Sequence, residues 1–370
     1  MAATETVRVL LIAPPPEIVG GQSVQAARLR QALARQAGVE LSYLPFPPAV
    51  PRPLKLLQRL RFVRTIFNTL AFQALLLARI RKVDAVHVFT PSFFAFMWAP
   101  APTLAVARLF GRKSVLNYRD GRAEDHLRGW RSARPLIGLA DAVVAPSEYL
   151  VDVFARYGLP VRSISNVIDP SAFRYRRRAR VQPRFLHNRG LEPLYNVGCT
   201  LRAFALVQQR YPDASLVVTS DGPCRAELEQ LASDLALRNV RFVGAVSQQE
   251  MTRIYDDADI YFNSPDLDCM PGSILECYAS GLPIVSTRAG GIPYILFHER
   301  TGLLVDLDDH EAMAQAALRL LEEDGLAARL SDDGRKELSK YDSETVSAQW
   351  VALYRELKRV ERRSNGAGVN

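Results

Sequence analysis

The chain has 370 residues, more than one hydrophobic core usually organises, so we expect two domains of roughly 150 to 200 residues each. Hydrophobic residues make up 48% and charged residues 23% of the sequence, which excludes disordered, collagen-like and disulfide-rich chains. The net charge of +8 is unevenly distributed, because residues 1–180 contain 27 Lys+Arg and 11 Asp+Glu, whereas residues 181–370 contain 20 and 28. The basic first half suggests contact with a polyanion, a phosphorylated acceptor or an anionic membrane surface, and simple solubility is the alternative.

Short apolar runs alternate with longer amphipathic segments along the chain. In the first half the strand candidates are Val7–Ala13, Val39–Pro45, Asp84–Phe89, Lys113–Tyr118, Asp141–Pro146 and Val161–Val167. In the second half they are Phe185–Asn188, Ala214–Ser220, Val240–Val246, Asp259–Asn263, Pro283–Thr287 and Gly302–Val305. Helices are expected between them, among others at Tyr195–Arg210, Cys224–Leu235, Gln248–Ala258 and Ser273–Ser280. This alternation predicts an α/β protein with two doubly wound, Rossmann-like halves.

The expected join between the halves is Asp169–Phe173 and the basic run that follows it to Arg180, interpreted as an exposed charged linker. We predict an N-terminal domain at 1–178 and a C-terminal domain at 179–342. A last helix at about 343–360 is expected to pack back on the first domain. Because open parallel sheets bind ligands beyond the carboxyl ends of their strands, two such domains facing each other predict an active site in the cleft between them.

The uncharged stretch Ala85–Ala107 is long enough to span a bilayer, but its prolines and its change of periodicity favour a strand followed by a broken helix. The N-terminus has no secretion-signal pattern, and the four cysteines lack the spacing of a redox or zinc motif. We therefore expect reduced thiols and a cytoplasmic location.

The segment Leu54–Ile80 is predicted to be an amphipathic helix. Its apolar residues are spaced by four and three, at Leu56, Leu60, Val63, Phe67, Leu70, Ala74 and Leu77. Basic residues flank this stripe at Lys55, Arg59, Arg61 and Arg64. Cations beside an apolar face are typical of a helix on an anionic lipid surface, as is the nearby aromatic run Phe93–Trp98. Packing of the stripe against the domain's own sheet is the alternative.

Two loops of the first half carry candidate ligand groups. Gly20 and Gly21 precede a predicted helix, whose N-terminal N–H groups can bind phosphate, and a plain turn is the alternative. After Lys113–Tyr118, Asp120 is a candidate catalytic carboxylate, and Arg119 and His126 are candidate acceptor contacts. Surface solvation is the alternative for these three residues.

The most specific pattern runs from Asp266 to Glu276 and is followed by a Pro-Ile-Val strand at 283–285 and the turn Gly-Gly-Ile-Pro at 290–293. Pro271-Gly272-Ser273 is expected to open a helix whose free N–H groups can face a diphosphate. Glu276 can accept both hydroxyls of a ribose, and Asp268 can accept a sugar hydroxyl.

With these motifs the chain resembles the large retaining glycosyltransferase family four, which has the GT-B fold. That family carries two glutamates separated by seven residues, and Asp268 and Glu276 fit this spacing with an aspartate in the first place. Segments such as Ser220–Pro223 and Thr301–Val305 extend the resemblance over nearly the whole chain. The resemblance implies that the first predicted domain binds the acceptor and the second binds the nucleotide sugar. We expect catalytic roles for Asp120, Asp268 and Arg189, and donor contacts from Gly20, Gly21, Arg189, Asp268, Met270, Pro271, Gly272, Ser273 and Glu276.

Two positions depart from the family pattern. The family's phosphate-binding arginine is followed, five residues on, by a lysine and a glycine, whereas Leu194 and Tyr195 follow Arg189 at this distance. Tyr294 stands where the family often has an acidic residue after Gly-Gly-Ile-Pro. Arg189 still suits a diphosphate, because a guanidinium can bind two oxygens at once.

We therefore expect a hexosyltransferase-like enzyme that moves a sugar from a nucleotide diphosphate sugar to a glycan or lipid-linked acceptor, in cell-envelope or polysaccharide biosynthesis. The resemblance implies retention of the anomeric configuration and no required metal or other cofactor. We expect the protein to contact the anionic inner face of the membrane, and we do not expect it to bind nucleic acid. The alternatives are a nucleotide-sugar epimerase or hydrolase on the same fold, and a non-catalytic subunit that binds a sugar nucleotide or lipid.

Overall fold

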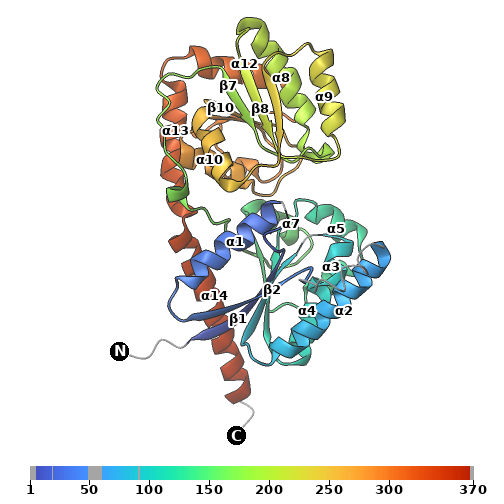
Figure 1. The fold of residues 1–370 in the computed structure, drawn as a ribbon. Helices are drawn as coiled ribbons and strands as arrows, with labels where there is room; N and C mark the ends of the chain where they lie inside the picture. Colours follow the sequence, from blue (N-terminus) through green and yellow to red (C-terminus); the bar gives the residue numbers. More distant parts are fainter. Residues whose placement is uncertain (1–5, 19, 49–60, 91, 367–370) are drawn as a thin grey trace. The chain divides into compact units, whose positions relative to one another are not determined.

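The computed structural model describes residues 6–18, 20–48, 61–90 and 92–366. The chain divides into two units, which we call unit 1 (Met1–Val167 with Ser343–Asn370) and unit 2 (Ile168–Asp342). Figure 1 shows each unit as a sheet covered by helices. The division falls before Ile168, directly ahead of the join expected at 169–180 and about ten residues before the predicted domain boundary at 178.

Unit 1 contains a six-stranded parallel sheet in the order β2-β1-β3-β4-β5-β6. Its strands are β1 (Val7–Ala13), β2 (Val39–Pro45), β3 (Ala85–Thr90), β4 (Lys113–Tyr118), β5 (Ala142–Ala145) and β6 (Arg162–Ser163). β3 and β4 pair in register from Ala85 opposite Lys113 to Thr90 opposite Tyr118. The loops that follow Thr90 and Tyr118 therefore start side by side at the carboxyl edge of the sheet.

The helices of unit 1 are α1 (Gly21–Ala34), α2 (Arg61–Ile80), α3 (Phe94–Trp98), α4 (Pro100–Leu109), α5 (Ala123–Gly129), α6 (Ala133–Ile137), α7 (Glu148–Ala155) and α14 (Ser343–Gly366). Helices α1 and α14 cover one face of the sheet, and α2 and α4 lie on the other side (Figure 1). The stretch Ala85–Ala107 forms β3, α3 and most of α4, which confirms the prediction of a strand and a broken helix. Among the described residues, no helix combines the length and apolar character needed to cross a membrane.

The last helix is joined to the sheet of unit 1 through a buried histidine. The His87 ring lies 4.3 Å from the Trp350 ring of α14, centroid to centroid, and stacks on it. Nδ1 of His87 is 2.6 Å from the Tyr354 hydroxyl, and Nε2 is 3.0 Å from Nδ2 of Asn117. Burial lowers the pKa of His87 to about 3, so the ring is neutral at physiological pH.

Unit 2 contains a second six-stranded parallel sheet, in the order β12-β11-β10-β7-β8-β9. Its strands are β7 (Arg184–His187), β8 (Ser215–Thr219), β9 (Val240–Gly244), β10 (Ile260–Asn263), β11 (Ile284–Thr287) and β12 (Leu303–Val305). Its α-helices are α8 (Val197–Arg210), α9 (Arg225–Asp234), α10 (Gln248–Asp257), α11 (Gly272–Ser280), α12 (His310–Glu322) and α13 (Leu326–Glu337). Every predicted strand run overlaps one observed strand, which confirms the doubly wound architecture of both halves.

Local signals explain where the helices around the site begin and end. Helix α10 starts at a capping box, in which the Ser247 hydroxyl accepts from the Glu250 amide while the Glu250 carboxylate accepts from the Ser247 amide. Helix α11 ends at Gly281 with φ of 66°. A Cβ at Gly281 would lie 2.6 Å from the carbonyl oxygen of Arg176, so both the backbone angle and the packing require glycine.

The basic run before β7 is part of unit 2. Arg174, Arg177 and Arg180 are exposed, as expected, but the prediction of an exposed linker is wrong for Arg178. Arg178 is fully buried and donates to the carbonyl oxygens of Tyr255, Ala258 and Ser280 at 2.6–3.0 Å. Ion pairs join Arg174 to Asp256, Arg176 to Asp259 and Arg177 to Asp332. The run therefore joins α10, α11 and α13, and acidic partners from the same unit neutralise its charge.

Candidate functional site

The candidate site lies at the carboxyl ends of β7, β10 and β11 in unit 2. Residues 188–196 follow β7, residues 264–271 follow β10, and residues 288–293 follow β11. These three strands are neighbours in the sheet, so their following loops meet at one edge. This is the edge where doubly wound sheets bind ligands.

An ion pair between Arg189 and Asp268 forms the centre of this edge. Nη2 of Arg189 donates to Oδ2 of Asp268, and Nη1 is 3.4 Å from Oγ of Ser273. Burial by itself would lower the pKa of Arg189, but Asp268, Tyr195 and Tyr261 together outweigh burial, and the pKa lies above its ordinary value. The structure thus brings together three residues that the sequence predicted for a diphosphate and sugar site.

Tyr195 stands where the resembled family has the glycine that follows its lysine, and it supports the face of this guanidinium. Its ring centroid lies 4.5 Å from the Arg189 guanidinium carbon. Tyr195 ends a 3₁₀ turn, and the next residue, Asn196, caps α8 through its side chain. This cation–π contact, made by the residue next to the lysine position, orients Arg189 without adding a second positive charge.

The loop that carries Asp268 is held in place by the Gly-Gly-Ile-Pro turn. Oδ1 of Asp268 accepts from the amide of Met270 at 3.0 Å, and its carbonyl oxygen accepts from the amide of Gly291 at 2.7 Å. A Cβ at Gly291 would lie only 2.0 Å from the carbonyl oxygen of Cys269. In unit 2 this glycine is therefore required for the close approach of two loops.

Helix α11 starts beside the ion pair, with Pro271 in the cap position. The amides of Gly272 and Ser273 lie in its first turn, where a helix provides no internal acceptors. These N–H groups and the positive end of the helix dipole suit a phosphate group. The side chains of Met270 and Pro271 are buried in unit 2, so at these two positions the backbone is the part that a ligand could contact.

Glu276 lies one turn further along α11 and is oriented by a row of hydrogen bonds. The Tyr261 hydroxyl donates to Oδ1 of Asn188 at 2.6 Å, and Nδ2 of Asn188 donates to the Tyr255 hydroxyl at 2.5 Å. The Tyr255 hydroxyl in turn donates to Oε2 of Glu276 at 2.7 Å. Burial and the Glu276 charge raise the pKa of Tyr255 well above its ordinary value, so Tyr255 remains a donor.

The sequence analysis did not identify Asn188, Tyr255 or Tyr261 as residues of the site. Asn188 could have been identified from the sequence, because it is the polar residue directly after the strand β7. Tyr255 and Tyr261 are fully buried, and their place in a helix and a strand makes them look like ordinary core residues.

In unit 1, Asp120 lies in the loop after β4 and accepts three kinds of hydrogen bond. The amide of Ser92 donates at 3.1 Å, the amide of Arg122 at 3.0 Å, and the Arg122 guanidinium at 3.2 Å. Burial alone would raise the pKa of Asp120, but these hydrogen bonds outweigh it and the pKa is lowered. Asp120 is therefore an ionised carboxylate at the carboxyl edge of the first sheet.

Arg119 and His126 have different environments from the one expected for acceptor contacts. Arg119 is half-buried, donates to Oδ1 of Asn166 and lies 4.8 Å from the Phe89 ring centroid. His126 is fully buried, with Nδ1 2.8 Å from the Tyr118 hydroxyl, and burial lowers its pKa to about 4. A fully buried, neutral ring cannot touch an acceptor in this conformation, so the placement of His126 argues for a packing role.

Gly20 and Gly21 lie at the exposed start of α1, and a Cβ on either would meet no atom within 4 Å. Close packing therefore does not require glycine at these positions, and their contact with a donor stays a prediction.

Lys55 and Arg59 lie outside the described residues, as does the side chain of Arg61, the first residue of α2. Arg64 is exposed on α2.

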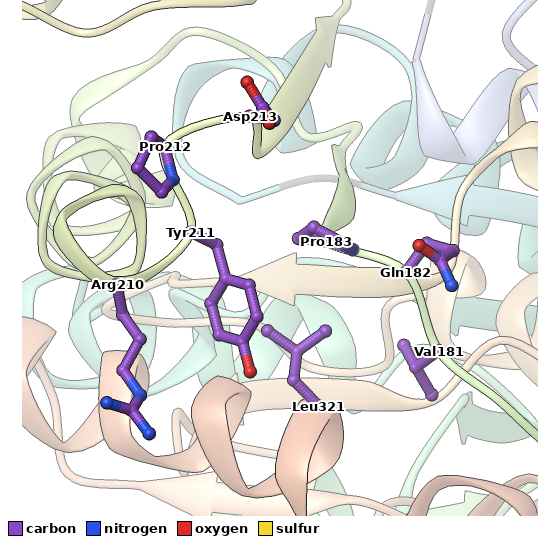
Figure 2. Close-up of a pocket in the computed structure, with 8 residues that line it drawn as sticks. All are labelled: Val181, Gln182, Pro183, Arg210, Tyr211, Pro212, Asp213 and Leu321. Carbon is purple, nitrogen blue, oxygen red and sulfur yellow. The ribbon is translucent and has the colours of Figure 1, made fainter.

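A hollow of about 450 Å³ lies at the opposite, amino-terminal edge of the unit 2 sheet. Figure 2 shows its lining by the segments that precede β7 and β8, with Arg210 and Tyr211 at the end of α8 and Leu321 from α12. It contains none of the predicted site residues. Within the described part of the chain, no cluster of His, Cys, Asp and Glu side chains has a metal-binding arrangement.

Two family models match the chain. The model for Glycosyltransferase Family 4 matches residues 19–172, and the model for Glycosyl transferases group 1 matches residues 183–323. The second match contains Arg189, Asp268 and Glu276, and the first contains Asp120.

Two characterised relatives illustrate the similarity in sequence. The D-inositol 3-phosphate glycosyltransferase of Corynebacterium urealyticum is 33% identical over 165 residues, which are 42% of this chain and 39% of that protein. The GDP-mannose-dependent alpha-(1-6)-phosphatidylinositol monomannoside mannosyltransferase of Mycobacterium tuberculosis is 29% identical over 304 residues, which are 74% of this chain and 75% of that protein.

Solved structures establish the fold. Sucrose-phosphate synthase from Thermosynechococcus elongatus superposes with a TM-score of 0.76 and 20% identity, over 96% of this chain and 100% of that one. HepE of Anabaena, solved with UDP and glucose, superposes with a TM-score of 0.72 and 15% identity, over 94% of this chain and 99% of that one. The two parallel six-stranded sheets and this likeness confirm the predicted GT-B fold.

Proposed function

The chain belongs to the group 1, family 4 glycosyltransferases, and from this premise we propose that it transfers a hexose from a nucleotide diphosphate sugar to a glycan or lipid-linked acceptor with retention of the anomeric configuration. The observation that carries the proposal is the cluster of Arg189, Asp268 and Ser273 beside the start of α11, with Glu276 one turn along the same helix. A cation, free N–H groups and a carboxylate in this order suit a diphosphate followed by a ribose.

The names of the relatives support the donor and acceptor classes. The mycobacterial relative is named for GDP-mannose and a phosphatidylinositol mannoside, and HepE was also solved with UDP-glucose. We extend to this chain the shared chemistry, a nucleotide diphosphate hexose as donor and a hydroxyl group as acceptor.

Donor binding by this site requires an exchange of partners at Arg189. A diphosphate carries more negative charge than the single carboxylate of Asp268, so it can compete for the guanidinium, which then binds two phosphate oxygens. Asp268 is thereby released to accept a hydroxyl of the donor sugar. Glu276, held by Tyr255, accepts from the ribose hydroxyls.

The transfer step needs charge stabilisation where the bond to the diphosphate breaks. Arg189 and the amides at the start of α11 would stabilise the departing diphosphate, and such fixed donors are usually the largest single contribution to catalysis. The proposal includes no metal ion, because these groups provide the positive charge that the leaving group needs. Family membership supports retention through attack from the face that the diphosphate leaves, and we assign the ionised Asp120 to the acceptor.

The experiment that tests this proposal is a turnover assay with UDP- and GDP-hexoses, with and without a membrane lipid extract as acceptor source. We expect nucleotide diphosphate release that depends on the acceptor, is unchanged by EDTA, and gives a product with the donor's anomeric configuration by NMR. Release without acceptor would instead indicate a hydrolase, and an epimerised sugar nucleotide an epimerase. Tight donor binding without any turnover would identify a non-catalytic subunit, an alternative to which the missing lysine lends support.

A further inference from the structure

Helix α2 has a buried side and an exposed apolar side, whose centres are about 120° apart around the helix axis. Its inner side consists of Asn68, Phe72, Leu76 and Ile80, spaced by four residues and all buried. On the outer side, Ile66, Leu70 and Leu77 have exposed fractions of 55%, 65% and 46%. With 3.6 residues per turn, these three outer residues lie within about 40° of one another around the helix axis.

The outer side contains the described part of the stripe predicted from the sequence. Leu70, Ala74 and Leu77 are exposed, and Phe67 is half-buried. For the described part of the stripe, the alternative of packing against the domain's own sheet is wrong, because Leu70, Ala74 and Leu77 are exposed. The buried side of α2 is formed by Phe72, Leu76 and Ile80 instead. A helix that is apolar on both sides normally has a partner on both sides.

The neighbouring helix α3 exposes further large apolar side chains. Phe94 is 72% exposed, Trp98 40% and Met97 36%. Helix α4 contacts both α2 and α3, so the three helices belong to one side of unit 1 (Figure 1). We call the exposed apolar residues of α2 and α3, namely Ile66, Leu70, Leu77, Phe94, Met97 and Trp98, the apolar surface.

The part of the sequence that forms these three helices is strongly basic. Between Glu40 and Asp120 the sequence contains twelve lysines and arginines but one acidic residue, Asp84. Asp84 is paired with Arg8 of β1 at 2.7 Å and with Lys358 of α14 at 3.0 Å. Cations at the ends of α2 and α4 are exposed, namely Arg64, Arg81, Lys82 and Arg108.

We propose that unit 1 docks on an anionic lipid bilayer through the apolar surface, with Arg64, Arg81, Lys82 and Arg108 contacting the lipid phosphates. A bilayer provides both an apolar interior for leucine and phenylalanine side chains and a dense negative surface for the cations. Tryptophan is enriched at that depth of the membrane. An acidic protein would match the charge, but it would need an apolar face of its own to cover Leu70 and Phe94.

This inference goes beyond the proposed transfer reaction and does not depend on it. The test uses the full chain in sedimentation with vesicles of phosphatidylcholine, and of phosphatidylcholine mixed with phosphatidylglycerol. We expect binding to the mixed vesicles at low salt, weak binding at high salt, and no binding to phosphatidylcholine alone. The salt effect follows because the Debye length shortens to about 3 Å in molar salt.

Two sets of variants separate the apolar and the ionic contributions. Leu70→Glu with Phe94→Glu should weaken binding at low salt by at least about tenfold, since two apolar side chains are lost and two negative charges face the anionic lipid. Arg64→Gln, Arg81→Gln and Lys82→Gln together should weaken binding and flatten its salt dependence. The matched control is Leu307→Glu, a leucine of unit 2 that is 49% exposed, and it should bind like wild type. Nucleotide binding and circular dichroism verify that each variant is folded.

Three results would overturn the proposal. Wild-type protein that ignores the mixed vesicles at low salt excludes the bilayer. Equal binding of wild type and of the Leu70→Glu, Phe94→Glu variant excludes the apolar surface. A shift of that variant from oligomer to monomer in sedimentation velocity, without loss of vesicle binding, would show that a second copy of the chain covers the surface instead.

Discussion

The Tyr255 hydroxyl donates a hydrogen bond of 2.7 Å to Oε2 of Glu276. Tyr255 belongs to α10 and Glu276 to α11, and Asn188 and Tyr261 extend the row of hydrogen bonds to the ends of β7 and β10. Tyr255 is fully buried, so packing holds its hydroxyl in one place. One carboxylate oxygen of Glu276 is thus held before any ligand arrives, which reduces the entropy cost of ribose binding.

We expect Tyr255→Phe to weaken donor binding by roughly 0.5–1.5 kcal/mol, the usual net value of one hydrogen bond. Because the ribose contact is the same before and during transfer, KM should rise while kcat changes little. The matched control is Tyr278→Phe on α11, whose hydroxyl bonds to Ile295 and Thr301 rather than to Glu276. Calorimetric titration with the nucleotide checks both variants, and an equal loss of affinity in the two would mean that Tyr255 acts only on folding.

Glu276→Gln should weaken donor binding by about 1–3 kcal/mol, the range for hydrogen bonds that involve a charged group. The glutamine amide oxygen can still accept from Tyr255, so the thermal midpoint of unfolding should stay close to that of wild type. Nucleotide affinity is again the measurement. Unchanged affinity for every accepted nucleotide would remove Glu276 from the donor site.

Arg189→Ala should lower turnover strongly, because the cation of the proposed phosphate site is lost. Arg189→Lys should recover only part of the turnover, since a point charge cannot bind two oxygens as the guanidinium does or lie flat on the Tyr195 ring. Steady-state rates with a saturating donor measure both variants. Full activity of the alanine variant would show that another cation binds the diphosphate.

Gly291→Ala should displace the loop at residues 268–270, because the new Cβ would lie 2.0 Å from the Cys269 carbonyl oxygen. We expect a stability loss of about 1–3 kcal/mol, typical of overpacking, together with weaker donor binding. Gly129→Ala is the control, since a Cβ there meets no atom within 4 Å. Thermal unfolding and nucleotide titration should separate the two variants, and a Gly291→Ala protein with wild-type affinity would contradict the coupling of these loops.

The stability of unit 1 should fall as the pH falls below 6.5. His87 has a folded-state pKa of about 3, whereas an unfolded histidine titrates near 6.5, so between these values the unfolded chain binds more protons. The free energy of unfolding should therefore decrease by about 1.4 kcal/mol per pH unit for this residue. His87→Asn should reduce the slope by about that amount.

Tryptophan fluorescence during urea unfolding is a suitable measurement for this pH dependence. The three tryptophans, Trp98, Trp130 and Trp350, all belong to unit 1, so the signal reports that unit alone. Equal slopes for wild type and His87→Asn would contradict a buried neutral ring at this position.

The sequence by itself determined the strands, the doubly wound architecture and the position of the Asp268–Glu276 motif. Apolar periodicity and turn residues act over a few neighbouring positions, so they can be read along the chain. Arg189, Asp268 and Ser273 were also predictable, since each follows a strand or opens a helix at one edge of a parallel sheet.

Only the tertiary structure decided how charged and aromatic side chains are used. Arg178 belongs to a basic run that reads as an exposed linker, yet it is buried because carbonyl oxygens some 80 to 100 residues later accept its hydrogen bonds. The sequence indicates that His126 contacts a ligand, but the residue lies among aromatic rings. The sequence indicates that Tyr255 is an ordinary core residue, but its hydroxyl bonds to Glu276. The sequence pattern allows Leu70 to lie on either the buried or the exposed side of α2. Burial and pairing depend on partners far away in the chain, which no local pattern records.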